Sequence, residues 1–152
     1  MSRISLAFSD RHRVLITHPV AADVVEKLDR FFIVDHHTDA QELAPDELFA
    51  RLKDKAGVLS TQNDWIDAAM IRQLRSLKVV SNMAEAYDNL DLEALTQAGI
   101  MATNAPGAAD TEATPGIMAN RAADNMIAAF GFGRIGGRPP NLLNPELLCD
   151  CC

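Results

Sequence analysis

The chain has 152 residues, of which 48% are hydrophobic and 23% are charged, a composition typical of a folded domain with its own core. Its formal net charge of −7 disfavours nucleic acids and anionic membranes as partners, because both bind basic surfaces. No apolar run approaches the roughly 18 residues of a membrane span, and the N-terminal segment lacks the apolar core of a signal peptide, so we expect a cytoplasmic protein.

Five short apolar runs alternate with amphipathic patterns along the chain. The first run, 13–17, is rich in β-branched residues and predicts a strand. Val20, Val24 and Leu28 then follow at helical spacing and predict a helix that ends near Phe31. The same alternation predicts a strand at 32–35, a helix at 44–52, a strand at 56–60, a helix at 67–77, a strand at 78–82, a helix at 91–98, a strand at 100–103 and a final helix at 117–130.

Strands that alternate with helices through short connections indicate a parallel sheet with helices on both faces. We therefore predict an α/β fold, a flavodoxin-like three-layer sandwich whose five-stranded parallel sheet has the strand order 2-1-3-4-5. This domain is expected to span 13–146, between an irregular N-terminal extension at 1–12 and a C-terminal tail at 147–152.

Histidine and cysteine residues do not fall into a metal-binding pattern. Neighbouring residues of a strand point to opposite faces, so we interpret His36 and His37 as a surface loop pair and predict no metal site. His18 follows the first strand, where ligands of such sheets bind, but no partner that would make it a proton donor is evident in the sequence. All three cysteines lie in the tail: Cys149, Cys151 and Cys152. Because none of them can form a disulfide within the core, we expect a reducing compartment. Their spacing does not match that of a zinc finger.

The segment NMAEAYDNLD at 82–91 resembles the substrate domain of the D-2-hydroxyacid dehydrogenases, NAD(P)-dependent enzymes that act on glyoxylate, hydroxypyruvate and phosphoglycerate. The resemblance covers about 13–114 and 117–146. It implies that backbone N–H groups of the loop after the fourth strand, which holds Ala84, Glu85 and Ala86, bind the substrate carboxylate. It also implies a substrate contact from Thr61, although that residue fits equally well in a polar turn that caps the third strand.

Two positions of this loop depart from the family pattern. Glu85 stands where a hydrophobic residue is usual, and a carboxylate beside a carboxylate site repels the ligand unless its side chain points outward. Ala86 stands where glycine is usual, and it narrows the backbone freedom of the loop because glycine alone readily adopts φ > 0. We therefore expect Thr61, Ala84, Glu85 and Ala86 to form a vestigial substrate site.

Between 107 and 117 the chain departs from the family more strongly. A family member would enter a nicotinamide-binding domain here, whereas this chain reaches its final helix through a join near 114–116. The family's arginine, glutamate and histidine trio lies in that domain or its hinge, so we expect an engineered substrate domain without catalytic residues, cofactor or activity of its own. The alternatives are a weak binding module for 2-keto or 2-hydroxy acids, and an enzyme fragment that needs a separate nicotinamide domain.

Because removal of a domain uncovers apolar surface, we also expect a homodimer.

A glycine pattern that matches the dinucleotide-binding fingerprint occurs at Gly131, Gly133 and Gly136. The fingerprint functions only where it follows a strand and opens a helix, so that the pyrophosphate meets the helix N-terminus. Here it follows a helix and precedes Pro139 and Pro140, which cannot lie in a helix interior. We interpret it as a glycine-rich helix stop or a remnant of engineering, and predict no cofactor-binding residues.

Overall fold

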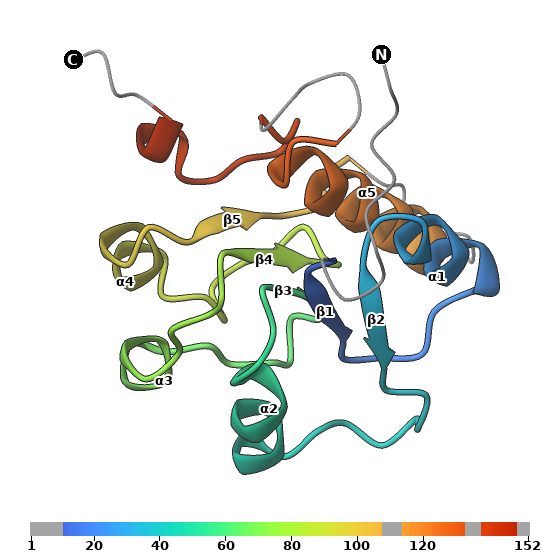
Figure 1. Ribbon diagram of the computed structural model, residues 1–152, viewed down its shortest axis with the longest axis horizontal. Coiled ribbons are helices and arrows are strands. Elements are labelled where there is room, and N and C mark those ends of the chain that lie inside the picture. The colour runs from blue at the N-terminus through green and yellow to red at the C-terminus, as the bar shows by residue number, and fades with distance from the viewer. Residues whose placement is uncertain (1–10, 108–113, 133–137, 149–152) are drawn as a thin grey trace.

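Five short strands form a single parallel sheet at the centre of the computed structural model, which describes residues 11–107, 114–132 and 138–148 (Figure 1). The strand order is β2-β1-β3-β4-β5, which confirms the flavodoxin-like order expected from the sequence. The strands are β1 (Arg13–Ile16), β2 (Ile33–His36), β3 (Gly57–Ser60), β4 (Val79–Asn82) and β5 (Met101–Thr103).

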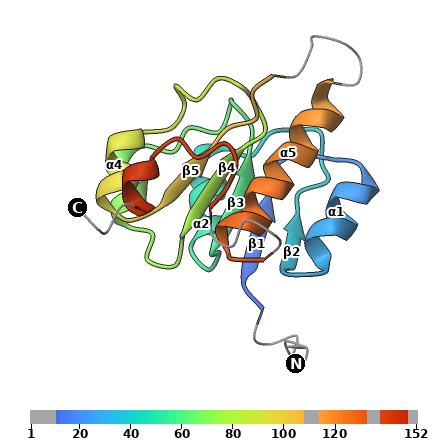
Figure 2. The ribbon, with the colours of Figure 1, turned by 90° about the horizontal axis from the view of Figure 1, so that it is seen from above.

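Helices cover both faces of this sheet. On one face α1 (Ala22–Asp29) and α5 (Thr114–Ala129) lie side by side (Figure 2), while α2 (Pro45–Leu52), α3 (Ala68–Arg72) and α4 (Leu92–Gln97) cover the other. A 3₁₀ turn, η2 (Pro145–Leu148), follows the last extended segment. Within the described ranges, no helix is long and apolar enough to cross a bilayer.

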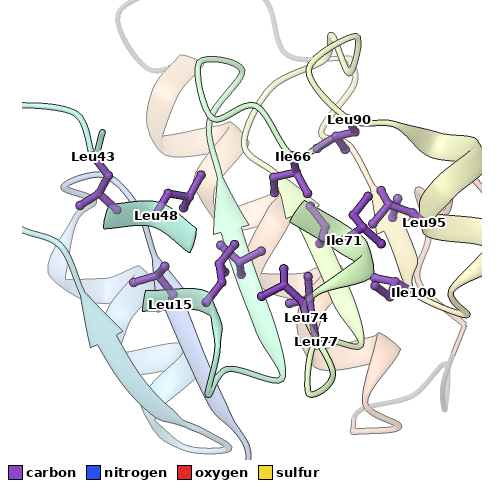
Figure 3. Close-up of a cluster of buried hydrophobic side chains, with 14 residues drawn as sticks. Leu15, Leu43, Leu48, Ile66, Ile71, Leu74, Leu77, Leu90, Leu95 and Ile100 are labelled. Atoms are coloured by element: carbon purple, nitrogen blue, oxygen red, sulfur yellow. The ribbon is translucent and has the colours of Figure 1, made fainter. Parts of the chain in front are cut away.

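The sheet lies between two hydrophobic clusters; β1, β3, β4 and β5 contribute residues to both, whereas the half-buried β2 adds Val34 to one of them. Val14 and Ile16 of β1 pack toward α1 and α5, whereas Leu15 between them packs toward α2. Figure 3 shows the second cluster, in which leucine and isoleucine side chains from α2, α3 and α4 meet the sheet. Gly57 allows a close approach on the first face, because an added Cβ would lie 2.6 Å from the Sδ atom of Met126.

Two helices differ in length from the sequence prediction. The third was expected to reach 77 but ends at Arg72, where Gln73 and Leu74 donate to Met70 and Ile71 in tighter turns. Leu74 and Leu77 are buried although they lie outside the helix. Hydrophobic residues at helical spacing therefore indicate buried positions here, but not a continuous helix. The final helix begins at Thr114 instead of 117, which places the expected join at 114–116 inside its first turn. Proline is well tolerated there because its missing N–H would be unpaired in any case.

The segment after α5 completes the sheet. Leu142 lies antiparallel to Thr103 of β5, and the Leu143 N–H donates to the Ala102 carbonyl at 2.8 Å. The fully buried Asn144 mimics a further strand residue, because its side chain accepts from the Ala102 N–H at 3.0 Å and donates to the Ile100 carbonyl at 2.8 Å. These contacts cover the β5 edge with the chain's own C-terminal segment.

Candidate functional site

A cleft of about 600 Å³ opens at the carboxyl ends of β1, β3 and β4, against the first turn of α5. A more apolar cavity of about 350 Å³ adjoins it and shares His18, Thr61, Met83 and Pro115 with it. This edge is where parallel α/β sheets bind their ligands. The cleft is lined by His18, Glu42, Thr61, Gln62, Asn63, Met83, Ala84, Glu85, Ala86, Thr114, Pro115 and Met118.

The loop after β4 is oriented by hydrogen bonds to its carbonyl groups. The Ala84 carbonyl accepts from the Ala105 N–H at 2.9 Å, and the Glu85 carbonyl accepts from Asn104 Nδ2 at 2.9 Å. The Ala86 carbonyl accepts from Asn82 Nδ2, also at 2.9 Å. In contrast, the N–H groups of residues 84–86 donate to no group in the described part of the chain. The loop therefore has its acceptors satisfied and three consecutive donors unused beside the cleft, an arrangement that suits an anion.

Ala86 does not strain this loop. Only glycines have a positive φ among the described residues, so the φ of Ala86 is negative. The left-handed conformation that glycine would have provided is therefore not needed for the carbonyl orientation seen here. The sequence-based objection to Ala86 does not apply to this backbone geometry.

Thr61 lies in the cleft wall, but its hydroxyl group is already engaged. It donates to Asp64 Oδ2 at 3.2 Å and accepts from the Asn63 N–H at 3.2 Å. The same Asp64 oxygen accepts from the Thr61 N–H at 2.8 Å and from the Thr17 hydroxyl at 2.6 Å. This geometry favours the polar-turn interpretation of Thr61 over that of a substrate donor.

A buried amide network, which the sequence interpretation missed, joins the loops after β3 and β4. Ser60 donates to Asn82 Oδ1 at 2.7 Å, and Asn82 Nδ2 donates to Asn89 Oδ1 at 3.0 Å. Asn89 Nδ2 in turn donates to the Thr61 carbonyl at 3.1 Å and to the Asp64 carbonyl at 2.8 Å. All described buried side-chain polar atoms have hydrogen-bond partners. The polar network beneath the cleft is therefore fully satisfied. The only advance signal was three polar residues, Ser60, Asn82 and Asn89, at or after strand ends.

The histidines differ from the expected surface pair. His36 ends β2 half-buried, with its Nε2 atom 3.2 Å from the His18 carbonyl oxygen and 3.3 Å from the Val20 nitrogen. His37 is also half-buried, with Nε2 2.7 Å from the Gln41 carbonyl oxygen and Nδ1 3.2 Å from Arg51. The two rings have separate partners because neighbouring strand residues point in opposite directions. Within the described ranges no three His, Cys, Asp or Glu side chains are grouped to hold a metal ion.

Gly131 of the dinucleotide-like pattern closes a helix. Its φ is +84°, its N–H donates to the Ala128 carbonyl at 2.9 Å, and the Phe132 N–H donates to the Ile127 carbonyl at 3.1 Å. These two bonds form a Schellman motif, the helix stop expected from the sequence. A helix C-terminus carries a negative partial charge, so its end is unsuited to a pyrophosphate. Gly133 and Gly136 lie outside the described residues, as do the three cysteines and residues 1–10 of the N-terminal extension.

Known proteins share this sequence pattern and fold. The family model for the D-isomer specific 2-hydroxyacid dehydrogenase catalytic domain matches residues 14–143. The glyoxylate reductase of Aeropyrum pernix is 32% identical over 104 residues, which is 68% of this chain and 31% of that protein. The glyoxylate reductase of Thermococcus onnurineus is 30% identical over 112 residues, 74% of this chain and 31% of that protein. The chain thus spans about a third of the length of these relatives.

Solved structures agree with the fold. The TT0316 protein of Thermus thermophilus superimposes with a TM-score of 0.55 at 30% identity, over 62% of this chain and 30% of that one. The D-isomer specific 2-hydroxyacid dehydrogenase of Polaromonas has a TM-score of 0.61 at 20% identity, over 64% of this chain and 31% of that one. The second likeness concerns the fold alone, since its sequence identity is low.

Proposed function

Because the chain belongs to the D-isomer specific 2-hydroxyacid dehydrogenase family, through its catalytic domain, we propose that it is a substrate domain that binds the carboxylate of a small 2-keto or 2-hydroxy acid and transfers no hydride by itself. The carboxylate lies against the N–H groups of Ala84, Glu85 and Ala86. The single observation that supports this most strongly is the loop geometry, in which all three carbonyls are engaged and all three N–H groups remain unused among the described residues.

The physical basis of this binding is preorganisation. The loop carbonyls are already held by hydrogen bonds, so the loop loses little entropy when an anion arrives, and its N–H groups need not give up other described partners. The first turn of α5 forms the opposite wall and adds the positive end of a 16-residue helix dipole. The Asn82 and Asn89 side chains keep the loop in this orientation.

We propose a lack of independent activity because of the segments that the resemblance implies for a full-length family member and that would lie outside this domain. The nicotinamide domain and the arginine, glutamate and histidine trio would enter after Gly107, whereas in this chain α5 begins at Thr114. The family model matches residues 14–143, a range that includes that point. An engineered excision of the nicotinamide domain accounts for both features, and hydride transfer has no donor without a bound nicotinamide.

Binding is tested by titration of the isotope-labelled protein with pyruvate, followed by backbone amide chemical shifts. The expected result is a saturable shift confined to the N–H groups of residues 84–86 and their cleft neighbours, with a dissociation constant in the millimolar range for so small a ligand. Acetamide, which is similar in size and uncharged, is the matched control. Equal shifts with acetamide, or none with pyruvate, would contradict the proposed site.

Hydride transfer is tested separately by NADH oxidation with glyoxylate. We expect a rate equal to the protein-free background. A faster rate in the purified chain would refute the second half of the proposal. A rate that rises only when a separately expressed nicotinamide domain is added would show that the chain is an enzyme fragment completed in trans.

A further inference from the structure

Two acidic residues line the cleft beside the unused N–H groups. Glu85 belongs to the anion-binding loop itself, and Glu42 comes from the segment between β2 and α2. Both residues are exposed, and the described residues that line the cleft include neither lysine nor arginine. The cleft therefore combines donors for one anionic group with two negative charges of its own.

Glu42 is held in place rather than freely mobile. Its Oε2 atom accepts from Asn63 Nδ2 at 2.6 Å, and Asn63 is itself part of the cleft wall. The residue before it is tied down, since the Gln41 carbonyl accepts from the His37 ring at 2.7 Å. The residue after it, Leu43, is buried in the hydrophobic cluster next to Leu48 (Figure 3). The neighbours of Glu42 thus hold the backbone of this segment, and one exposed hydrogen bond orients the Glu42 carboxylate along the cleft wall.

Such an arrangement penalises ligands that carry only negative charge. A carboxylate bound at residues 84–86 is stabilised by the N–H groups but repelled by Glu85 on the same loop. A second negative group on the ligand, such as another carboxylate, adds further repulsion from Glu42. A positive group at the other end of the ligand has the opposite effect, because it neutralises the acids while the ligand carboxylate keeps its donors.

On the assumption that the proposed carboxylate site is correct, we propose that Glu85 and Glu42 make this cleft selective for 2-keto or 2-hydroxy acids that carry a cationic amine or guanidinium group on their side chain. Acids with neutral side chains bind less well, and dicarboxylates bind least. Glu85 and Glu42 are specificity-determining residues in this scheme. The binding donors remain the backbone N–H groups of the loop.

The test compares three ligands built on the same five-carbon 2-keto acid chain by the amide shifts of Glu85 and Ala86. These are 5-guanidino-2-oxopentanoate with a cationic end, 2-oxopentanoate with a neutral end and 2-oxoglutarate with an anionic end. At low salt the expected affinity decreases in that order, with about a tenfold difference between the first and the last. Adding salt to about 0.5 M should reduce this difference severalfold, because mobile ions screen exposed charges.

Variants identify the cause. In Glu85→Gln combined with Glu42→Gln, the two extreme ligands should differ by less than about twofold, and 2-oxoglutarate should bind more tightly than it does to the unmodified protein. Glu26→Gln on α1 is the matched control, since it removes one exposed acid of the same type that does not line the cleft. It should leave the order and the size of the preference unchanged.

The outcomes separate the two proposals. If 2-oxopentanoate shifts the loop amides but the three ligands bind equally, or if the control variant abolishes the preference as the double variant does, the selectivity proposal is wrong and the carboxylate site stands. If none of the three ligands shifts the loop amides, the carboxylate site itself is wrong, and the selectivity proposal fails with it.

Discussion

Asn89 is the residue on which the shape of the cleft most depends. Its side chain is buried, and it bridges the loop after β3 to the loop after β4 by donating to the Thr61 and Asp64 carbonyls. Through Asn82 the same network reaches the Ala86 carbonyl and so orients the loop after β4. A buried amide in such a network is costly to remove, because each abandoned partner loses its hydrogen bond in a place that water reaches poorly.

Replacing Asn89 with alanine should lower the free energy of unfolding by about 2–3 kcal/mol, since two buried carbonyls lose their donor. Urea denaturation measures this change. Asn120→Ala is the matched control, because the Asn120 side chain makes only an exposed bond to the Gly116 carbonyl, and it should change stability by less than about 0.5 kcal/mol. Equal effects of the two variants would mean that the network does not stabilise the fold.

Asp35 is the ionisable side chain through which we expect folding to respond to pH. Burial alone would raise the pKa of Asp35, but hydrogen bonds and charges from Arg51 and Lys55 outweigh that effect and hold the pKa below its ordinary value. A lowered carboxyl pKa means that the unfolded chain binds protons more readily. The contribution of Asp35 to stability is therefore complete above the unfolded-state pKa of about 3.9 and disappears as the pH falls through the lower folded-state pKa.

We accordingly expect the Asp35→Asn variant to have a free energy of unfolding lower by about 0.5–1 kcal/mol at neutral pH. The effect is small because the Asp35 side chain is 40% exposed and because Lys55 keeps Asp54 as a partner. The deficit relative to the unmodified protein should narrow as the pH falls below about 4. Denaturation curves at several pH values measure it. Asp88→Asn, an exposed acid, serves as the control, and a deficit in Asp35→Asn that stays constant down to low pH would contradict the electrostatic explanation.

At the scale of elements, α5 determines how the fold is closed. It packs on the sheet through Ala122, Ala123 and Met126, its Asp124 pairs with Lys27 of α1 at 2.8 Å, and its buried Asn125 donates to the Asn104 carbonyl at 3.1 Å. Its two ends use glycine and proline differently. Pro115 occupies a first-turn position that needs no N–H donor, whereas Gly131 supplies the left-handed residue that terminates the helix.

Glycine substitutions at the two ends of α5, one in its first turn and one just after its last residue, should therefore have opposite effects on stability. Gly131→Ala should destabilise the protein by about 1 kcal/mol, because alanine disfavours the φ of +84° that the Schellman motif requires. Gly116→Ala should stabilise it by about 0.5–1 kcal/mol, since nothing lies within 4 Å of the added Cβ and alanine favours helix. Thermal unfolding of both variants tests this, and a loss of stability in both would disprove the assigned helix boundaries.

At the scale of the whole molecule, the cleft edge is also where large apolar side chains are most exposed. Trp65 is 61% exposed and Tyr87 is 41% exposed, and they flank the two loops that Ile66 and Leu90 join through a parallel bridge. We propose these residues as the apolar surface of the homodimer that domain removal leads us to expect. The net charge of −7 opposes such association, so salt should promote it.

Sedimentation under reducing conditions should accordingly detect a dimer whose population rises with protein concentration and with salt. Trp65→Ser combined with Tyr87→Ser should shift the equilibrium toward monomer, while Ile117→Ser, a similar change at another exposed apolar site on α5, tests whether the effect is local. A strictly monomeric protein at the highest soluble concentration would refute the proposed homodimer.

The sequence alone was sufficient for the order of the elements, the strand order of the sheet and the family. The order of the elements and of the strands depends on local periodicity, on short connections and on the handedness of crossovers. The family was indicated by the resemblance of the segment at 82–91. It also placed Thr61, Ala84, Glu85 and Ala86 at one edge of the sheet, where the structure brings them together in one cleft. It overestimated the third helix because buried Leu74 and Leu77 follow helical spacing without a helix.

Only the tertiary structure decided which groups of that cleft can bind. The carbonyls of residues 84–86 are engaged by Asn82, Asn104 and Ala105, and Asn89 reaches partners 28 and 25 residues away in the sequence. Thr61, which the sequence offered as a donor, is instead engaged by Asp64. A residue type specifies that a donor or an acceptor exists, but whether that group remains unused depends on partners that only folding brings near, and the proposed anion site rests on N–H groups that folding leaves unused.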